Sequence, residues 1–558
     1  MNIKKLFFRV LICLLKISIF VSSCSILVVI VWGAIDVSFG CLELQISHPN
    51  ESLLILLVSL SLYYRIRHSL TFAKQIDAIN DFLIKKEKLF LFVIVSFSFI
   101  YILRIKLFQH FTFNTGAYDL AMYDTAIRNT LEGKFLFADQ LGRNFFSEHF
   151  SPILLLMCPL YLVFDTSVVL FVVEALVVAV GVLFVYKIGR YYSLSPVVSL
   201  LVSFIFLNYK YLAMGVLSDF HPEIWEPTFL LGAILFLLKR KTWPYVICLI
   251  LALSCKEDIP IYALGIGIYA LFNRKTKLIG ALTCFISLLW AVVAWKFIIP
   301  AAMPSDAVVS HFVGARWGHL GDTYKDVAIA LLQQPIYMMK CIFSAAPIDM
   351  LKTLAFIPFL GIEALLIALP GLILNTTANF EPQATLLMHY AAPIIPFVIW
   401  GYIIGLIRLR YLVLSIPWCK RNSQLVLVCG VCLLTIIMSL SFGEDYTFFR
   451  FDSHVMARYR VMNQVPLGSS VSCGADFVPH LVRKTHPYVF PNEPSRDREY
   501  RHCDFILVDK KGNPWPLQKE GLDSEIDSIL FQTSKYCIVK SEDGVYLFDN
   551  IYKKRKIH

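Results

Sequence analysis

Long apolar runs recur along this chain, and most are about as long as a lipid bilayer is thick. A helix needs roughly 20 mainly apolar residues to cross the hydrocarbon core. The runs near or above this length are 6–32, 89–108, 168–186, 196–217, 278–298 and 425–440. The chain is 57% hydrophobic and 16% charged, with a mean hydropathy of +0.66, which excludes an ordinary soluble protein. The sequence therefore predicts an α-helical polytopic membrane protein.

Basic residues between the runs indicate the orientation. They fall in loops at 4–9, 65–88, 187–190, 239–241, 274–277 and 408–421. Cytoplasmic loops carry an excess of Lys and Arg, so these loops are expected in the cytoplasm. The net charge of +11 then reflects topology, and charges scattered in this way do not form a nucleic-acid-binding surface. We expect an integral, multi-pass membrane protein with the C-terminus outside.

Five polar clusters lie in the opposite set of loops. They are residues 119–124, 148–152, 219–223, 256–258 and 389–390. Ionisable side chains are costly at membrane depth and are usually retained there for function. Because all five clusters are expected outside, the pattern predicts a polar site at the extracytoplasmic face of the bundle.

Two apolar segments are too irregular to cross as single helices. Residues 153–164 must form a half-helix or an interfacial helix, because a full span would reverse the sidedness of the following loops. The run 341–374 is interrupted at Pro358 and Gly361 and is expected to form two short helices. The count is then about thirteen spans, within a range of about 11–14.

The chain changes character after Ser441, where the apolar runs end and charge density rises. The patterns predict strands at 471–473, 488–490 and 505–508, a helix at 475–483, and a hairpin of 536–539 with 544–548. The expected domains are a membrane hairpin with a basic cytoplasmic loop (1–88), a transmembrane domain with outer loops (89–441), and a small extracytoplasmic α/β domain (442–558).

The polar clusters belong to longer motifs with a recognisable order. These are Gly116-Ala-Tyr-Asp-Leu-Ala-Met-Tyr-Asp124, His149-Phe-Ser-Pro-Ile153, Asp219-Phe-His-Pro-Glu223, Lys256-Glu-Asp258, His389-Tyr390 and Tyr488-Val-Phe-Pro491. Their order resembles domain-of-unknown-function family 2079, predicted membrane proteins, over roughly residues 89–509.

That family in turn resembles the GT-C membrane glycosyltransferases, which move a sugar from a polyprenyl-phosphate carrier to an acceptor on the outer face. The resemblance implies a GT-C-like bundle, outer catalytic loops and a polyprenyl-phosphate-sugar donor. It does not name the acceptor. One departure stands out, because the Lys-Pro-Pro-Leu of one GT-C branch is replaced by His149-Phe-Ser-Pro152.

Asp119 is the candidate catalytic base. Inverting glycosyl transfer needs a carboxylate that accepts the proton of the acceptor hydroxyl. Asp119 follows the end of the 89–108 run by about ten residues, so its loop can fold back to the membrane surface. A carboxylate that caps a helix start is the alternative. Asp124 is a candidate substrate-binding residue, but helical spacing points it in another direction.

Asp219, His221 and Glu223 are spaced by two residues. In an extended segment all three would share one face and could hold a divalent metal such as Mg²⁺ or Mn²⁺. The alternative is a capped helix start, with Pro222 in the first helical turn. The sequence leaves both interpretations open, and either places the three residues at the predicted site.

The remaining candidates are expected to bind the donor. Lys256 and Glu257 lie at a polar turn between two short apolar segments, where Lys256 can contact a phosphate or form a salt bridge. Arg316 lies in a Gly-rich segment, 314–321, that is either a closing loop or a connector. The others are Glu148, His149, His389 and Tyr390.

Three classes of function stay open. The first is a polyprenyl-phosphate-dependent glycosyltransferase. The second is a transporter or flippase of a lipid-linked or small polar substrate, for which broken helices and buried carboxylates also serve. The third is a non-catalytic membrane assembly protein. A transporter should spread its polar residues across the bilayer midplane, whereas an enzyme should gather them at one face beside a cavity.

Overall fold

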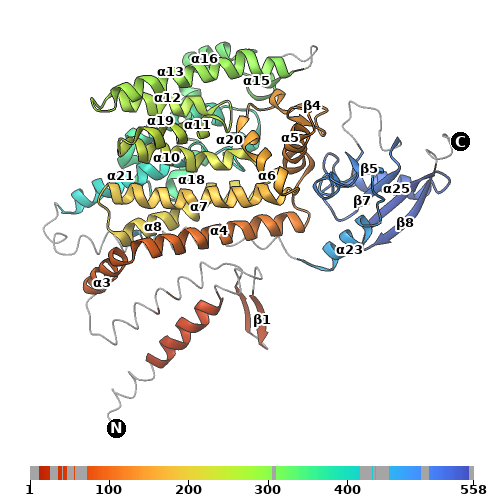
Figure 1. Ribbon diagram of the computed structural model, residues 1–558, viewed down its shortest axis with the longest axis horizontal. Coiled ribbons are helices and arrows are strands. Elements are labelled where there is room, and N and C mark those ends of the chain that lie inside the picture. The colour runs from red at the N-terminus through yellow and green to blue at the C-terminus, as the bar shows by residue number, and fades with distance from the viewer. Residues whose placement is uncertain are drawn as a thin grey trace, which may run out of the picture.

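The computed structural model describes residues 12–25, 35–39, 42–46, 56, 59, 72–303, 310–414, 430, 431, 434, 451–491 and 502–551. A bundle of apolar helices makes up most of it, and a five-stranded domain lies against one end of that bundle (Figure 1). The N-terminal part contributes a helix, Ile12–Ser25, and the antiparallel strands β1 (Ile35–Phe39) and β2 (Leu42–Ile46). Most of the expected N-terminal hairpin and of the expected span 425–440 lies outside the described residues.

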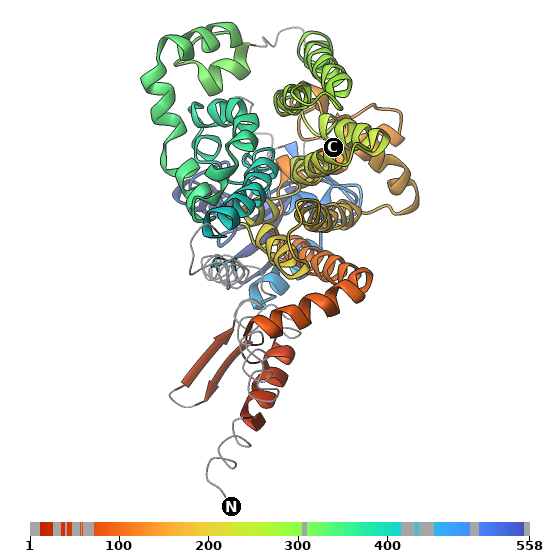
Figure 2. The ribbon, with the colours of Figure 1, turned by 90° about the vertical axis from the view of Figure 1, so that its left-hand side faces the viewer.

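The bundle helices share a hydrophobic core and are seen nearly end-on in Figure 2. They are α4 (Glu87–Phe111), α7 (Val168–Tyr191), α8 (Pro196–Leu207), α9 (Lys210–Leu217), α10 (Glu226–Leu238), α11 (Thr242–Leu253), α12 (Ile259–Leu271), α13 (Lys277–Val293), α19 (Ile362–Thr376) and α21 (Ile395–Leu414). Helix α3 (Phe72–Lys85) packs against α8 and α4 outside this core. Trp400 and Phe206 are fully buried between them, whereas Phe92 and Phe285 face outward. Outward aromatic side chains suit a lipid environment.

Within the described residues, five helices are long and apolar enough to cross a membrane, or six if the bent pair of α8 and α9 counts as one span. About thirteen were expected. Helices α11 and α12 have 12 and 13 residues, so at about 1.5 Å per residue each is shorter than the roughly 30 Å hydrocarbon core. Together they form a pair of short helices that meet at a polar turn, as the sequence predicted for residues 256–258.

The connections at one end of the bundle carry the polar clusters. Helix α4 ends there, α7 begins there, and η4 and α10 follow the end of α9 there. The connecting elements are η1 (Ala117–Ala121), α5 (Met122–Leu131), β3 (Phe137–Ala138), β4 (Arg143–Asn144), η2 (Phe145–Ser147), η3 (Pro152–Met157), α6 (Cys158–Val163), η4 (Pro222–Trp225) and α20 (Glu381–Ala384). The expected half-helix at 153–164 corresponds to η3 and α6. We call this end of the bundle the site end.

A buried lysine ties three helices together near the site end. Lys106 of α4 donates to the carbonyl oxygens of Val216 (3.1 Å) and Ser218 (2.9 Å), at the C-terminus of α9. Its ammonium lies 3.2 Å from Glu174 of α7, and both side chains are fully buried. The last carbonyls of a helix lack internal partners, so Lys106 satisfies them where water is excluded. This polar group inside the bundle therefore has a structural role.

The segment between α13 and α19 consists of short helices. They are η5 (Ala294–Ile298), α14 (Ile299–Ala302), α15 (Ser310–Trp317), α16 (Tyr324–Gln333), α17 (Pro335–Ile342), α18 (Ala345–Lys352) and η6 (Ile357–Gly361). The run 341–374 is interrupted as expected, but the interruption lies at residues 353–356, and η6 and α19 together form one span of 20 residues, Ile357–Thr376. The Gly-rich segment 314–321, which was expected to be a closing loop or a connector, is half helical, because α15 reaches Trp317.

The C-terminal domain is a five-stranded sheet in the order β6-β5-β7-β9-β8. Its elements are α23 (Ser453–Met462), β5 (Ser470–Cys473), α24 (Val478–Leu481), β6 (His486–Val489), β7 (Phe505–Asp509), α25 (Lys519–Phe531), β8 (Tyr536–Glu542) and β9 (Val545–Asn550). Strands β5, β6 and β7 run parallel, and β9 pairs antiparallel with β7 and β8. The three predicted strands and the hairpin are confirmed, the helix predicted at 475–483 is the shorter α24, and helices α23 and α25 were missed.

Candidate functional site

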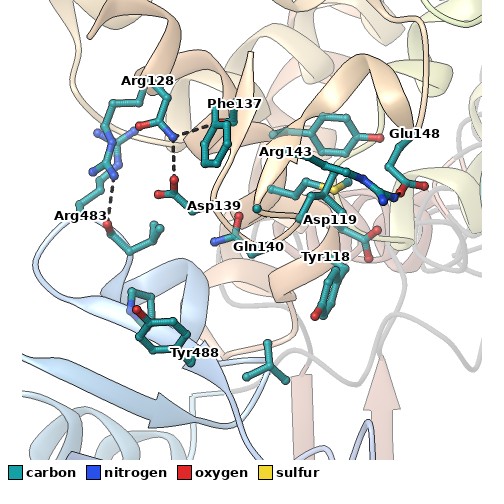
Figure 3. Close-up of a pocket in the computed structure, with 18 of the residues that line it drawn as sticks. Tyr118, Asp119, Arg128, Phe137, Asp139, Gln140, Arg143, Glu148, Arg483 and Tyr488 are labelled. Carbon is teal, nitrogen blue, oxygen red and sulfur yellow. Dashed lines mark hydrogen bonds and ion pairs between the residues drawn. The ribbon is translucent and has the colours of Figure 1, made fainter. Parts of the chain in front are cut away.

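A cavity of about 1010 Å³ lies between the site end of the bundle and the C-terminal domain. Figure 3 shows that α5 and the β3–β4 hairpin form one wall and the segment that bears Tyr488 forms the other. Its polar lining includes Tyr118, Asp119, Arg128, Lys134, Asp139, Arg143, Glu148, His149, His221, His389, Tyr390, Arg483, Lys484, His486 and Tyr488. Acidic, basic and aromatic side chains therefore face one space, as a site for a polar ligand requires.

Asp119 lies on the cavity wall in η1, a wide helical turn that leads into α5. Its side chain is 37% exposed, so it is accessible to a ligand. Single wide turns of this kind are frequently found at functional sites. Asp219 fixes the start of the turn, because its carboxylate accepts from the backbone N–H of Gly116 (2.5 Å) and of Leu120 (3.4 Å). Burial, and then the charge of Asp119, raise the pKa of Asp219 to about 6.

His221 connects the loop after α9 to Asp119. Its Nδ1 lies 3.0 Å from the carbonyl oxygen of Asp219, and its Nε2 lies 3.2 Å from an oxygen of Asp119. A carbonyl and a carboxylate only accept, so both ring nitrogens must carry protons and His221 is an imidazolium. Burial would lower the pKa of His221, but the Asp119 carboxylate raises it to about 9. A fixed positive charge thus lies beside Asp119 at neutral pH.

His389 stacks on His221, with ring centroids 4.0 Å apart. Burial, and then the charge of His221, hold the pKa of His389 well below its usual range, so this ring is neutral. Its Nε2 lies 3.9 Å from Glu223. Because a charged ring would repel His221, the stack holds one charged and one neutral imidazole. His389 thereby supports His221 from the loop before α21.

Glu223 and Lys256 form an ion pair of 2.9 Å behind the two histidines. Their side chains are only 3% and 11% exposed, and neither lines the cavity. Burial would raise the pKa of Glu223, but the Lys256 ammonium holds it well below its usual range. Lys256 also lies 5.8 Å from the ring of Tyr390, which does line the cavity. Of the two roles expected for Lys256, a phosphate contact and a salt bridge, the structure shows the salt bridge.

Glu257 and His149 form a second pair across the site. The Nδ1 of His149 lies 2.9 Å from Glu257, and the other oxygen of Glu257 accepts from the backbone N–H of Phe150 at 2.9 Å. Glu257 is buried, whereas His149 lines the cavity. Glu257 thus holds the His149 motif in place from the turn between α11 and α12.

The chain matches the family described as predicted membrane protein DUF2079 over residues 109–547. It belongs to that family. The match starts at the end of α4 and reaches β9, so it extends further toward the C-terminus than the motifs predicted. All the site residues described above lie inside it. A search of the curated proteins found no match.

Among solved structures, the chain is similar to ArnT from Cupriavidus metallidurans bound to undecaprenyl phosphate. The identity is 10% and the TM-score 0.44, with 82% of this chain and 97% of that chain covered.

The DUF2079 motifs thus meet at one place. The structure brings Asp119, His149, Asp219, His221, Glu223, Lys256, Glu257, His389 and Tyr390 together at the site end. Glu148 faces the same cavity in a pair with Arg143. Arg316 does not line the cavity, but its guanidinium lies 4.0 Å from the ring of Phe380 and 6.0 Å from the ring of Tyr390, which does.

The expected metal triad does not form. Pro222 and Glu223 start a short helical turn, so Asp219, His221 and Glu223 do not share one face. They point instead to backbone N–H groups, to Asp119 and to Lys256. Among the described residues, no group of three or more His, Cys, Asp or Glu side chains is arranged to hold a metal ion. The alternative expectation of a helix start is the one that the structure supports.

Sequence reasoning missed Arg483, which binds Asp124 from the C-terminal domain. Asp124 is 1% exposed and accepts from the hydroxyl of Tyr161 at 2.8 Å as well as from the Arg483 Nε at 3.2 Å. Asp124 therefore does not line the cavity, although its partner Arg483 does. No local pattern links residues 359 positions apart, so this pair had no signal in the sequence.

Proposed function

We propose that this chain is a membrane glycosyltransferase that moves a sugar from a polyprenyl-phosphate carrier to an acceptor on the extracytoplasmic face. The observation that carries the proposal is Asp119, an accessible carboxylate on the wall of a cavity of about 1010 Å³, 3.2 Å from a charged imidazole. Ligand pockets of about 300–1,000 Å³ hold drug-sized molecules, so a sugar and its phosphate fit a space of this size.

In the proposed reaction the acceptor hydroxyl attacks the anomeric carbon of the donor sugar. Asp119 accepts the hydroxyl proton as the new C–O bond forms. The bond between the anomeric carbon and the phosphate oxygen breaks, and the carrier phosphate leaves with the electron pair. The His221 imidazolium and the Arg143 guanidinium are the cavity groups that stabilise the growing phosphate charge. No step in this scheme requires Lys256 to touch the donor.

The distribution of polar groups favours an enzyme over a transporter. The ion pairs of Asp119, Glu223 and Glu257 all lie at helix ends on one side of the bundle. A transporter site is expected near the bilayer midplane, between broken helices. The buried pair of Lys106 and Glu174 inside the bundle has its own structural role at the end of α9. The positive-inside pattern of the loops supports the extracytoplasmic assignment and the bacterial inner membrane.

The test uses the purified full-length protein in lipid nanodiscs with a labelled polyprenyl-phosphate-linked hexose. Wild type should bind this donor and, with water in place of the acceptor hydroxyl, cleave it to free hexose and polyprenyl phosphate. Asp119→Asn keeps the shape but removes the basic carboxylate, so release should fall on the order of 10²-fold or more with donor affinity retained. Glu363→Gln removes a carboxylate from an exposed pair with Arg408 and serves as the control, so it should change neither the release of polyprenyl phosphate nor the donor affinity. Full activity of Asp119→Asn would refute the role of Asp119, and a wild type that binds no donor would refute the glycosyltransferase.

A further inference from the structure

The turn that carries Asp119 is built into two hydrophobic cores at once. Phe113, Ala117 and Ala121 pack in the core of the C-terminal domain. On the other side of the same turn, Leu120 and Tyr123 pack in the core of the site end. The turn is therefore a shared element of both domains, and the position of Asp119 depends on how the C-terminal domain is seated.

One ion pair fixes that seating beside the catalytic turn. Arg483 contacts Asp124 through Nε and a terminal nitrogen, and it also pairs with Asp165. Asp124 lies five residues after Asp119 in the helix that continues from η1. Arg483 and Tyr161 are the partners of a carboxylate that is 1% exposed. A buried carboxylate that loses its cation stays desolvated without a compensating charge, which is strongly destabilising. The contact with Arg483 therefore stabilises the position of this helix.

The two ends of the catalytic turn are thus held by different domains. At its start, Asp219 of the bundle accepts from Gly116 and Leu120. At its continuation, Arg483 of the C-terminal domain binds Asp124. Arg483 lies at the edge of the cavity, and its guanidinium is paired with two carboxylates, Asp124 and Asp165. Its position fits a role in orienting the turn.

We infer that Arg483 is a positioning residue that orients Asp119 through Asp124, so that the C-terminal domain is part of the catalytic unit. This inference rests on the proposed function for its kinetic readout only. Reacting groups must be held within a fraction of an ångström, and a misplacement of about 1 Å can cost 10²-fold in rate. Loss of Arg483 should therefore reduce turnover without removing any group from the reaction.

The first measurement does not depend on catalysis. Hydrogen–deuterium exchange of the purified full-length protein should show faster exchange of the amides of residues 116–124 in Arg483→Ala, by about tenfold or more, with the sheet β5–β9 unchanged. Arg460→Ala removes an arginine of the same domain from an exposed pair with Glu542 and should leave residues 116–124 as in wild type. Unchanged exchange at 116–124 in Arg483→Ala would overturn the inference, as would an equal loss of protection across the sheet.

The second measurement separates positioning from simple folding. With the labelled polyprenyl-phosphate hexose, Arg483→Ala should lower kcat by about 10-fold to 100-fold with KM for the donor unchanged. Arg483→Lys keeps one charged contact and should recover part of the rate. Asp124→Asn combined with Arg483→Ala should be no slower than the slower single variant, because both act through one contact. Multiplied effects in the double variant, or a KM change alone, would overturn the inference. If wild type shows no transfer at all, the proposed function fails while the exchange result still decides the inference.

Discussion

The site has two layers that use the same residue types for different purposes. In the front layer, Asp119 and His221 form a pair on the cavity wall, and Asp119 is 37% exposed. In the back layer, Glu223 and Lys256 form a pair of 2.9 Å that does not line the cavity, and Glu223 is 3% exposed. The front pair can meet a ligand, whereas the back pair meets only protein. The same residue types thus form one pair that a ligand can reach and one pair that is enclosed by protein.

The difference has a physical basis in solvation. A buried ion pair offsets a large desolvation cost by its internal attraction, so removing one partner leaves an unpaired charge. A half-exposed pair keeps water on one side and loses less when one partner is removed. We therefore expect back-layer variants to act mainly on stability and front-layer variants to act mainly on rate. Each prediction below tests this division.

The largest effect on stability is expected for Glu223→Gln. This change keeps the side-chain shape but leaves the Lys256 ammonium buried without its carboxylate, at a cost of about 3–5 kcal/mol. Glu363→Gln breaks an exposed pair with Arg408 and should cost at most about 1 kcal/mol. Thermal unfolding of both purified variants in the same detergent checks the comparison. Equal midpoints for the two would show that the back layer is not a buried ion pair in solution.

Some of this organisation follows from sequence pattern. Alternation of basic and polar loops predicted that five clusters would meet at one face, and they lie at one end of the bundle. The strands of the C-terminal domain follow from short β-rich runs between turn residues. Helix α25 also left a readable signal, since Leu522, Ile526 and Ile529 recur at helical spacing and are buried. That helix was therefore predictable and overlooked.

Other features had no local signal. The sequence could not place Lys256 behind the cavity, because a polar turn reads the same whether it faces ligand or protein. The sequence could not distinguish an extended triad from a helical turn at residues 219–223. In the structure, Pro222 occupies the first turn of a short helix. The contact between Asp124 and Arg483 joins positions 359 residues apart, so only the tertiary fold reveals it. The burial of a side chain and its long-range contacts depend on tertiary packing, and the periodicity of a sequence does not predict them.

A smaller effect, on rate rather than stability, is expected from the charge of His221. The Asp119 carboxylate raises the pKa of His221 above its ordinary value to about 9, against the lowering effect of burial. The imidazolium is therefore almost fully charged at neutral pH, and its charge is lost as the pH rises through about 9. The rate of donor cleavage should fall on this alkaline side. His221→Gln should lower the rate by about tenfold at neutral pH, as for a lost charged hydrogen bond, and should remove the alkaline limb. If the pH–rate profile of His221→Gln still shows an alkaline limb near pH 9, a group other than His221 causes that limb.

The smallest effect is expected for Asp219, which belongs to neither layer but holds the front one in place. Its carboxylate caps the turn of Asp119 through the N–H groups of Gly116 and Leu120, and a lost cap typically costs about 1 kcal/mol, or about fivefold in rate if the turn loosens. Burial and the charge of Asp119 raise the pKa of Asp219 to about 6, so protonation weakens the cap as the pH falls below that value.

Asp219→Asn mimics the protonated form and should have the low-pH rate at every pH, with no acid limb near pH 6. Asp139→Asn changes a cavity carboxylate that binds Asn129 instead, and it should leave the limb where it is. A pH–rate profile of the three proteins checks this, and an acid limb that survives in Asp219→Asn would mean that the turn is held by its packing in the two cores rather than by its cap.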